Sequence, residues 1–332
     1  MCLEQSCDDG IYINGDDVFQ FERMVAHYFS TSRACFVSSG SSALYLALKT
    51  LGIANGDEVI IPCMSWISTA HAVSRLGATP VFTEINRSFN MDICSLEEKI
   101  SMKTKAIMPV HFGGIPAEMH LIMKLARERN LFVIEDASQS FGNELDGQML
   151  GTFGDFGCFS LNPMKTFGAL GEAGLVVSQN DKLINNLRQK IYSGLNNMEL
   201  NHRGDNLQAR FLKVLLENFG EKQKKLKIIF DYYKKHLNSQ VELVGKKNNY
   251  IPYCINILVD QREAIEQEFG KREIEFKRLH VPLMVEHPCY RHNTSLPKSN
   301  EIAKKLLSLP YHQHLTENEV VEICSVINEA CK

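Results

Sequence analysis

The stretch that decides the fold reads Leu131-Phe132-Val133-Ile134-Glu135-Asp136. Four apolar residues that end in acids are typical of a buried strand whose polar end reaches the edge of a sheet. Further along the chain, an apolar run that ends shortly before a lysine reads Cys158-Phe159-Ser160-Leu161-Asn162-Pro163-Met164-Lys165. The sequence therefore places a carboxylate and an amine on loops that we expect to belong to one sheet.

The rest of the first half alternates strand-like and helix-like runs. We predict strands over residues 34–37, 58–62, 79–82, 106–110, 131–134, 157–161 and 175–178. Amphipathic helices are predicted between them, including residues 41–51, 66–76 and 116–128. A short helix is predicted to begin at Ser95, with Glu98 completing a capping box. This order predicts an α/β fold with a mostly parallel central sheet flanked by helices, whose ligands gather at the carboxyl ends of the strands.

The pattern changes after about residue 215. A lysine-rich run at 222–227 opens a predicted helix, and a strand-like run at 250–259, a helix near 262–270 and a final helix from Glu317 follow. We therefore predict a large α/β domain of residues 1–215 and a smaller C-terminal α+β domain of residues 216–332.

Composition argues against several classes of protein. Of the 332 residues, 44% are hydrophobic and 23% are charged, which is ordinary for a globular chain. The net charge of -3 favours neither nucleic acid nor an anionic membrane as a partner. No stretch approaches the roughly 20 apolar residues of a membrane span, and the acidic N-terminus does not resemble a signal peptide. Ten cysteines are scattered without a C-x-x-C pair, so we expect reduced thiols, no metal site and a cytoplasmic protein.

Two features near the expected ligand edge of the sheet suit a flat, phosphorylated ligand. The segment Ser38-Ser39-Gly40-Ser41-Ser42 joins a strand to a helix, so free N–H groups and serine hydroxyls could surround a phosphate. Helix capping alone is an equally good interpretation of these serines. Trp66, the only tryptophan, follows the strand at 58–62 and could stack on a planar ring. Packing in the core or at an interface is the alternative for Trp66.

The two apolar runs supply the reactive groups. Asp136 and Gln139 share a face if the chain turns helical after the strand, and Asp136 could pair with a pyridine nitrogen or simply cap a helix. Glu135 should point to the opposite face. Ser160 precedes Lys165 closely enough to add a hydroxyl to a phosphate site. A carboxylate that keeps a pyridine ring protonated and a lysine that closes an aldehyde as a Schiff base are what pyridoxal 5'-phosphate requires.

Other motifs carry less weight. His111 could line a site or make a structural hydrogen bond. The glycines in Gly151-x-x-Gly154-x-x-Gly157 precede a strand and do not form a dinucleotide fingerprint, so we interpret them as a turn. A hydrolase triad of Ser38 or Ser42 with His111 and an acid is disfavoured because the G-x-S-x-G elbow is absent.

Taken in order, these motifs resemble the DegT/StrS family of nucleotide-sugar aminotransferases, which have the type I fold of pyridoxal-phosphate enzymes. The resemblance covers nearly the whole chain. Its matching stretches lie at residues 38–44, 56–62, 109–114, 135–139, 159–165, 204–209, 307–310 and 315–317.

The resemblance implies a role for each matching residue. Lys165 would form the Schiff base and move protons, Asp136 would pair with the pyridine nitrogen, and Trp66 and Gln139 would contact the ring. The phosphate would be held by Ser41, Ser42 and Ser160. Asn206 would reach the phosphate site of the neighbouring subunit in a homodimer. Glutamate would donate the amine, and a nucleotide-linked keto sugar would accept it, as in polysaccharide biosynthesis.

The chain also departs from the family pattern. Asn162 replaces a histidine that is common three residues before the lysine, and Ser41 stands where threonine is usual. The N-terminus is short, which affects the expected sugar pocket more than the chemistry. A pyridoxal-phosphate-dependent sugar dehydratase and a non-catalytic, cofactor-binding regulatory protein are the alternatives. The presence of Lys165 favours transamination, because one kind of dehydratase in the family has histidine there.

Overall fold

The computed structural model describes residues 2–191, 201–246, 249–290 and 295–331. Its central sheet has seven strands in the order β1-β9-β8-β5-β4-β2-β3. They are β1 (Arg33–Val37), β2 (Glu58–Pro62), β3 (Thr79–Thr83), β4 (Thr104–Ile107), β5 (Phe132–Asp136), β8 (Phe156–Ser160) and β9 (Gly174–Ser178). Strand β9 runs antiparallel to its neighbours β1 and β8, and the other neighbouring strands of this sheet are parallel. The predicted α/β fold with a mostly parallel sheet is confirmed.

Helices cover both faces of this sheet because its strands are apolar on both sides. On β2, Val59 and Ile61 belong to one hydrophobic cluster, while Ile60 between them belongs to another. Helices α3 (Gly40–Thr50) and α4 (Ser68–Ser74) contribute to the first cluster, and α5 (Ile93–Lys99) and α6 (Met119–Arg129) to the second. Helix α2 (Asp16–Tyr28) packs against β1 and α8 (Asn206–Glu217), whereas α1 (Cys2–Asp9) and α7 (Asp181–Arg188) complete this half. A small hairpin, β6 (Glu144–Leu145) and β7 (Gln148–Met149), follows β5.

The predicted capping box at Ser95 is wrong. Helix α5 begins earlier, and the side chain of Asp92 accepts a hydrogen bond from the backbone N–H of Ser95. Aspartate is as good an N-cap as serine, and it stands one turn earlier, so Ser95 lies inside the helix.

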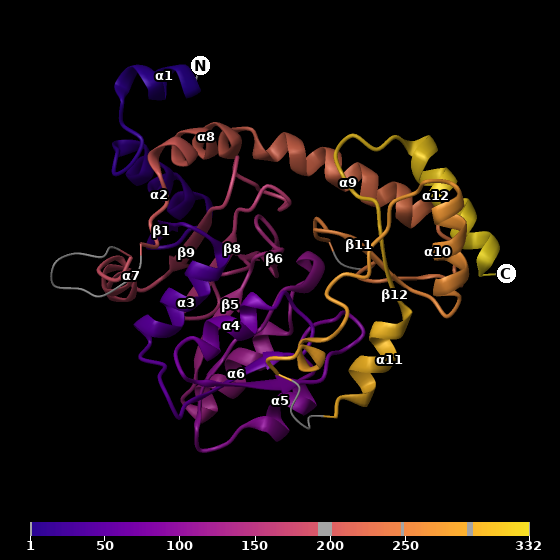
Figure 1. The fold of residues 1–332 in the computed structure, drawn as a ribbon, viewed down its shortest axis with the longest axis horizontal. Helices are drawn as coiled ribbons and strands as arrows, with labels where there is room; N and C mark the ends of the chain where they lie inside the picture. Colours follow the sequence, from indigo (N-terminus) through magenta and orange to yellow (C-terminus); the bar gives the residue numbers. More distant parts are fainter. Residues whose placement is uncertain (1, 192–200, 247–248, 291–294, 332) are drawn as a thin grey trace.

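The C-terminal part contains a second, antiparallel sheet in the order β10-β11-β12. Its strands are β10 (Glu242–Leu243), β11 (Ile255–Leu258) and β12 (Leu306–Leu309), and its helices are α9 (Phe219–His236), α10 (Arg262–Lys271), α11 (Pro297–Lys305) and α12 (Glu317–Ala330). Figure 1 shows α8 and α9 running along one side of the molecule from the large sheet to the small one. The predicted domain boundary at 215/216 falls inside α8 and stays a prediction.

The two parts share one hydrophobic core. A single cluster contains residues of α3 and β2 together with Ile257 of β11 and Leu307 of β12. Two short 3-10 turns lie where the two parts meet. They are η1 (Phe112–Gly114), after β4, and η2 (Met284–Glu286), before α11. Met284 N donates to Cys63 O just after β2, so the segment before α11 is tied to the carboxyl edge of the large sheet. Within the described ranges, no helix is both long and apolar enough to cross a membrane.

Candidate active site

A cavity of about 1000 Å³ lies at the carboxyl ends of the large sheet. Six of the residues predicted from the sequence line it: Ser41, Trp66, Asp136, Gln139, Ser160 and Lys165. They come from the segments after β1, β2, β5 and β8, as the rule for ligands of parallel sheets predicts. The opposite wall comes from the C-terminal part and includes Tyr253, Lys277, His280 and Met284.

Lys165 lies on the loop between β8 and β9. Asn162 shapes this loop: its backbone oxygen accepts from Lys165 N at 2.8 Å, and its side-chain oxygen accepts from Met164 N at 3.0 Å. The Lys165 Nζ lies 4.6 Å from the centre of the Tyr253 ring. Desolvation lowers the pKa of the Lys165 amine, although the nearby acids Asp136 and Glu172 oppose the shift. A larger share of this amine is therefore neutral, and nucleophilic, than of an exposed lysine.

Asp136 ends β5 with a buried carboxylate. Thr69 Oγ1 donates to its Oδ2 at 2.9 Å, and Ser138 N donates to its Oδ1 at 3.2 Å. Thr69 in turn is 2.8 Å from Ser65 Oγ. The sequence interpretation missed Thr69, although it stands three residues after Trp66 at a helix start, where both can face the same ligand.

Gln139 and Trp66 meet at His280. The Gln139 Oε1 accepts from Gly113 N at 2.7 Å, and its Nε2 lies 3.0 Å from His280 Nε2. The Trp66 side chain is 62% exposed, and its ring centre lies 6.2 Å from that of His280. An indole that lines a cavity and is this open can stack on a flat ligand. His280 was not predicted, because only the tertiary fold brings it to the sheet.

The start of helix α3 and Ser160 form one corner of the cavity. Ser39 Oγ caps the helix by accepting from Ser42 N at 3.1 Å, and Ser41 Oγ donates to Ser68 Oγ at 2.8 Å. A side chain at Gly40 would place its Cβ 2.7 Å from Ser160 Cβ, so only glycine lets the helix approach Ser160 this closely. Hydroxyls and free helix N–H groups together make a site for an anion.

Two predicted residues do not line the cavity. The Ser42 hydroxyl is buried, within 3.0 Å of Ser39 Oγ and of His202 Nδ1. Asn206 is buried on α8, where its Nδ2 donates to Ile11 O and to Asp17 Oδ2. Their predicted contacts with a phosphate stay predictions.

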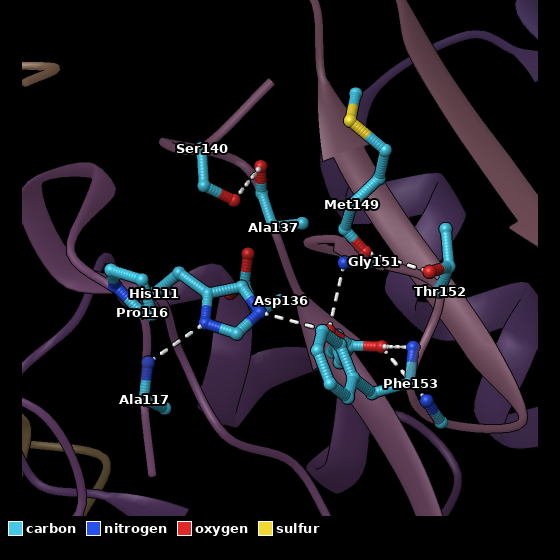
Figure 2. A network of polar contacts seen from close by, with 12 residues as sticks. His111, Pro116, Ala117, Asp136, Ala137, Ser140, Met149, Gly151, Thr152 and Phe153 are labelled. Carbon is cyan, nitrogen blue, oxygen red and sulfur yellow. Dashed lines mark hydrogen bonds and ion pairs between the residues drawn. The ribbon is translucent and has the colours of Figure 1, made fainter. Parts of the chain in front are cut away.

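Glu135 and His111 form a separate structural network behind the site. Glu135 points away from Asp136, as predicted, and accepts from the backbone N–H groups of Gly151, Phe153 and Gly154 at 2.7–2.8 Å. Figure 2 shows His111 beside this turn: its Nε2 lies 3.0 Å from Glu135 Oε2, and its Nδ1 accepts from Ala117 N. Since Nδ1 accepts, Nε2 carries the proton. The structural interpretation of His111 and the turn interpretation of the glycines are both confirmed, and Gly151 has a φ of 89° that favours glycine.

The chain is similar to sugar aminotransferases over nearly its full length. A model of the DegT/DnrJ/EryC1/StrS aminotransferase family matches residues 2–328. The chain is 34% identical to GDP-perosamine synthase of Escherichia coli O157:H7, covering 97% of this chain and 93% of that protein. It is 33% identical to UDP-N-acetyl-3-dehydro-alpha-D-glucosamine 3-aminotransferase of Acidithiobacillus ferrooxidans, covering 96% and 90%. The structure of S. venezuelae DesV, solved in complex with a ketimine intermediate, matches with a TM-score of 0.94 at 28% identity, covering 100% of this chain and 93% of DesV.

Proposed function

The chain belongs to the DegT/DnrJ/EryC1/StrS aminotransferase family and is a nucleotide-sugar aminotransferase, and from this premise we propose that its reaction takes place at Lys165 with bound pyridoxal 5'-phosphate. One observation carries the proposal. A lysine whose amine has a lowered pKa and a buried carboxylate line the same cavity as an exposed indole and two serines beside a helix start.

The residues present fit this cofactor. Asp136 is a buried acceptor held by Thr69 and suits a protonated ring nitrogen. Trp66 offers an aromatic face, and Gln139 lies beside it with its amide fixed by Gly113. The corner of Ser41, Ser160 and the α3 N-terminus suits a phosphate dianion.

When bound, pyridoxal phosphate supplies an aldehyde that condenses with amines and a ring that accepts the electron pair of a deprotonated carbon. The chain does the rest. Lys165 Nζ would take a proton from the amino donor's carbon and later deliver one to the acceptor's carbon, and desolvation favours the neutral amine that can accept a proton. The Asp136 carboxylate would keep the ring nitrogen protonated, and Trp66 and Gln139 would hold the ring within reach of Lys165.

The substrates follow from the same site and from the relatives. The names of the two similar relatives carry GDP and UDP, so we propose a keto sugar linked to a nucleoside diphosphate as the amine acceptor, in a pathway of polysaccharide synthesis. Glutamate is the proposed amino donor. We further propose a cytoplasmic homodimer in which Asn206 reaches the phosphate of the partner's site, and in which Ser42 helps Ser41 and Ser160 to hold the phosphate.

The first experiment asks which amine binds the cofactor. Protein loaded with pyridoxal phosphate is reduced with borohydride, digested and mapped by mass spectrometry. The adduct is expected on Lys165 and is expected to be lost in Lys165→Ala. Lys277 lines the same cavity, so Lys277→Ala is the matched control and keeps the adduct. An adduct that persists in Lys165→Ala would reject the assignment.

The second experiment asks what is transferred. Glutamate alone should change the absorption of the protein loaded with pyridoxal phosphate and release one equivalent of 2-oxoglutarate. A panel of GDP- and UDP-linked 3- and 4-keto sugars should then restore the starting absorption and yield an amino sugar. Keto product formed without any amino donor would indicate a dehydratase, and no response to glutamate or to any sugar would indicate a protein without turnover.

A further inference from the structure

His280 faces the cavity from the wall opposite the large sheet. It belongs to the segment between α10 and α11, which lines the cavity at residues 277–284, and it lies near Trp66 and edge-on to Phe112, with ring centres 5.5 Å apart. Its backbone has a φ of 56°, a left-handed conformation that is uncommon for a residue other than glycine. Such a conformation persists only where the surrounding structure imposes it, and it is concentrated at functional sites.

Hydrogen bonding fixes the protonation of this imidazole. Gly113 N is a donor, so the Gln139 atom that faces it is the acceptor Oε1. The Gln139 Nε2 is then a donor, and the His280 Nε2 that lies 3.0 Å away has to accept from it. An imidazolium has no acceptor, so His280 is neutral and carries its proton on Nδ1. Burial and the neighbouring Lys165 lower the pKa of His280 to about 3, which agrees with this geometry.

The Nδ1–H is available to a ligand. Within the parts of the chain that the structure describes, no side chain or backbone oxygen accepts a hydrogen bond from it. The wall that carries His280 also carries Lys277 and Arg278 and continues to His287. Asp136, Ser41 and Ser160, the residues proposed for the cofactor, lie on the other wall. An uncharged N–H donor beside cationic side chains suits an oxygen of a sugar whose diphosphate lies nearby.

We propose that His280 is a positioning residue for both the cofactor and the sugar: its Nε2 holds the Gln139 amide against the cofactor, and its Nδ1–H binds an oxygen of the nucleotide-linked sugar. The inference rests on the proposed function and adds a residue from the C-terminal part to the site. The position of the Gln139 amide and the contact with the sugar would both depend on the neutral imidazole of His280.

Two conservative variants separate the two nitrogens. The amide of asparagine reaches the place of Nδ1 and keeps a donor there, whereas the amide of glutamine reaches the place of Nε2 and keeps an acceptor for Gln139. His280→Leu removes both. His120→Asn, in an exposed pair with Asp146, is the matched control. Melting temperatures of all variants show whether each is folded.

The first readout is cofactor binding. Trp66 is the only tryptophan, so its fluorescence reports directly on the cavity when cofactor-free protein is titrated with pyridoxal phosphate. His280→Gln and His120→Asn are expected to bind as wild type does. His280→Asn and His280→Leu are expected to bind about fivefold more weakly, the effect of one lost hydrogen bond.

The second readout is the sugar KM, measured with the GDP- or UDP-linked keto sugar that the wild type converts fastest. His280→Asn is expected to keep this KM within about twofold, whereas His280→Gln and His280→Leu raise it about fivefold. The proposal is overturned if all three variants match wild type in both readouts, or if the asparagine and glutamine variants cannot be told apart. Failure of the proposed function would show differently, as wild-type protein without an adduct on Lys165.

Discussion

Thr69 Oγ1 donates a hydrogen bond of 2.9 Å to Asp136 Oδ2, and both side chains are buried. Thr69 belongs to α4, the helix that follows β2, whereas Asp136 ends β5. The bond therefore joins the carboxyl ends of two strands, β2 and β5, that β4 separates in the sheet. Ser65 extends the chain of hydroxyls behind Thr69. This arrangement fixes the direction in which the carboxylate faces the cavity, and it does so without a charged partner.

Replacing Thr69 by valine should therefore weaken cofactor binding without changing the shape of the site. Valine has the size of threonine but donates no hydrogen bond, so Asp136 Oδ2 loses its partner and Ser65 loses its acceptor. We expect the affinity for pyridoxal phosphate to fall about five- to tenfold, measured by quenching of Trp66 fluorescence. Thr69→Ser, which keeps the hydroxyl, should bind nearly as wild type does. Equal affinities of the valine and wild-type proteins would refute this role.

Lys165 should destabilise the cofactor-free fold in a pH-dependent way. Desolvation lowers the pKa of its amine below the ordinary value of 10.5. At pH values below the lowered pKa, the amine is charged in both states, and the folded state bears the full cost of burying it. Between the lowered and the ordinary pKa, the unfolded chain binds more protons, so stability rises with pH.

Lys165→Met should accordingly melt at a higher temperature than wild type at pH 7 when both lack cofactor. The difference should shrink as the pH rises from the lowered pKa toward 10.5, because a growing share of wild type then folds with a neutral amine. Lys103→Met, at an exposed turn position, controls for the general effect of losing a cation. A difference between Lys165→Met and wild type that is constant across this pH range would contradict the interpretation.

The sequence was sufficient to predict those cavity residues that lie at or after the ends of strands. Asp136, Ser160 and Trp66 directly end or follow apolar strands, and parallel strands bring such positions to one edge. Tyr253 and His280 were not predictable in this way, because they reach the cavity only when the C-terminal part packs on the sheet. Strand β12 was missed for a local reason: it begins at Leu306, directly after α11 ends at Lys305, with no glycine or proline between them. Ser42 was predicted to be in the site but does not line the cavity. It is the neighbour of Ser41 on helix α3, yet its side chain is buried, whereas Ser41 lines the cavity.

Tyr253 should act on Lys165 through its ring and not through its hydroxyl. Burial raises the pKa of Tyr253 to about 12, so the phenol stays protonated near neutral pH and is a poor base. Its ring face lies 4.6 Å from Lys165 Nζ and attracts the amine most when that is charged. Tyr253→Phe should keep the rate of the glutamate half-reaction, whereas Tyr253→Leu should slow it about three- to tenfold. Stopped-flow absorption of the loaded protein measures both, and an equal loss in the two variants would assign the role to the hydroxyl.

Glu135 should stabilise the fold and take no part in catalysis. Its carboxylate is fully buried and accepts from Gly151 N, Phe153 N and Gly154 N, while His111 donates to it from Nε2. Glutamine has the same shape, but its NH2 group would face one of these N–H donors. Two donors would then point at each other, and neither would have an acceptor. We expect Glu135→Gln to lower the free energy of unfolding by about 2–4 kcal/mol in urea titrations. The exposed Glu144→Gln should change it by less than about 0.5 kcal/mol. Unchanged unfolding of Glu135→Gln together with lost activity would instead move Glu135 into the catalytic site.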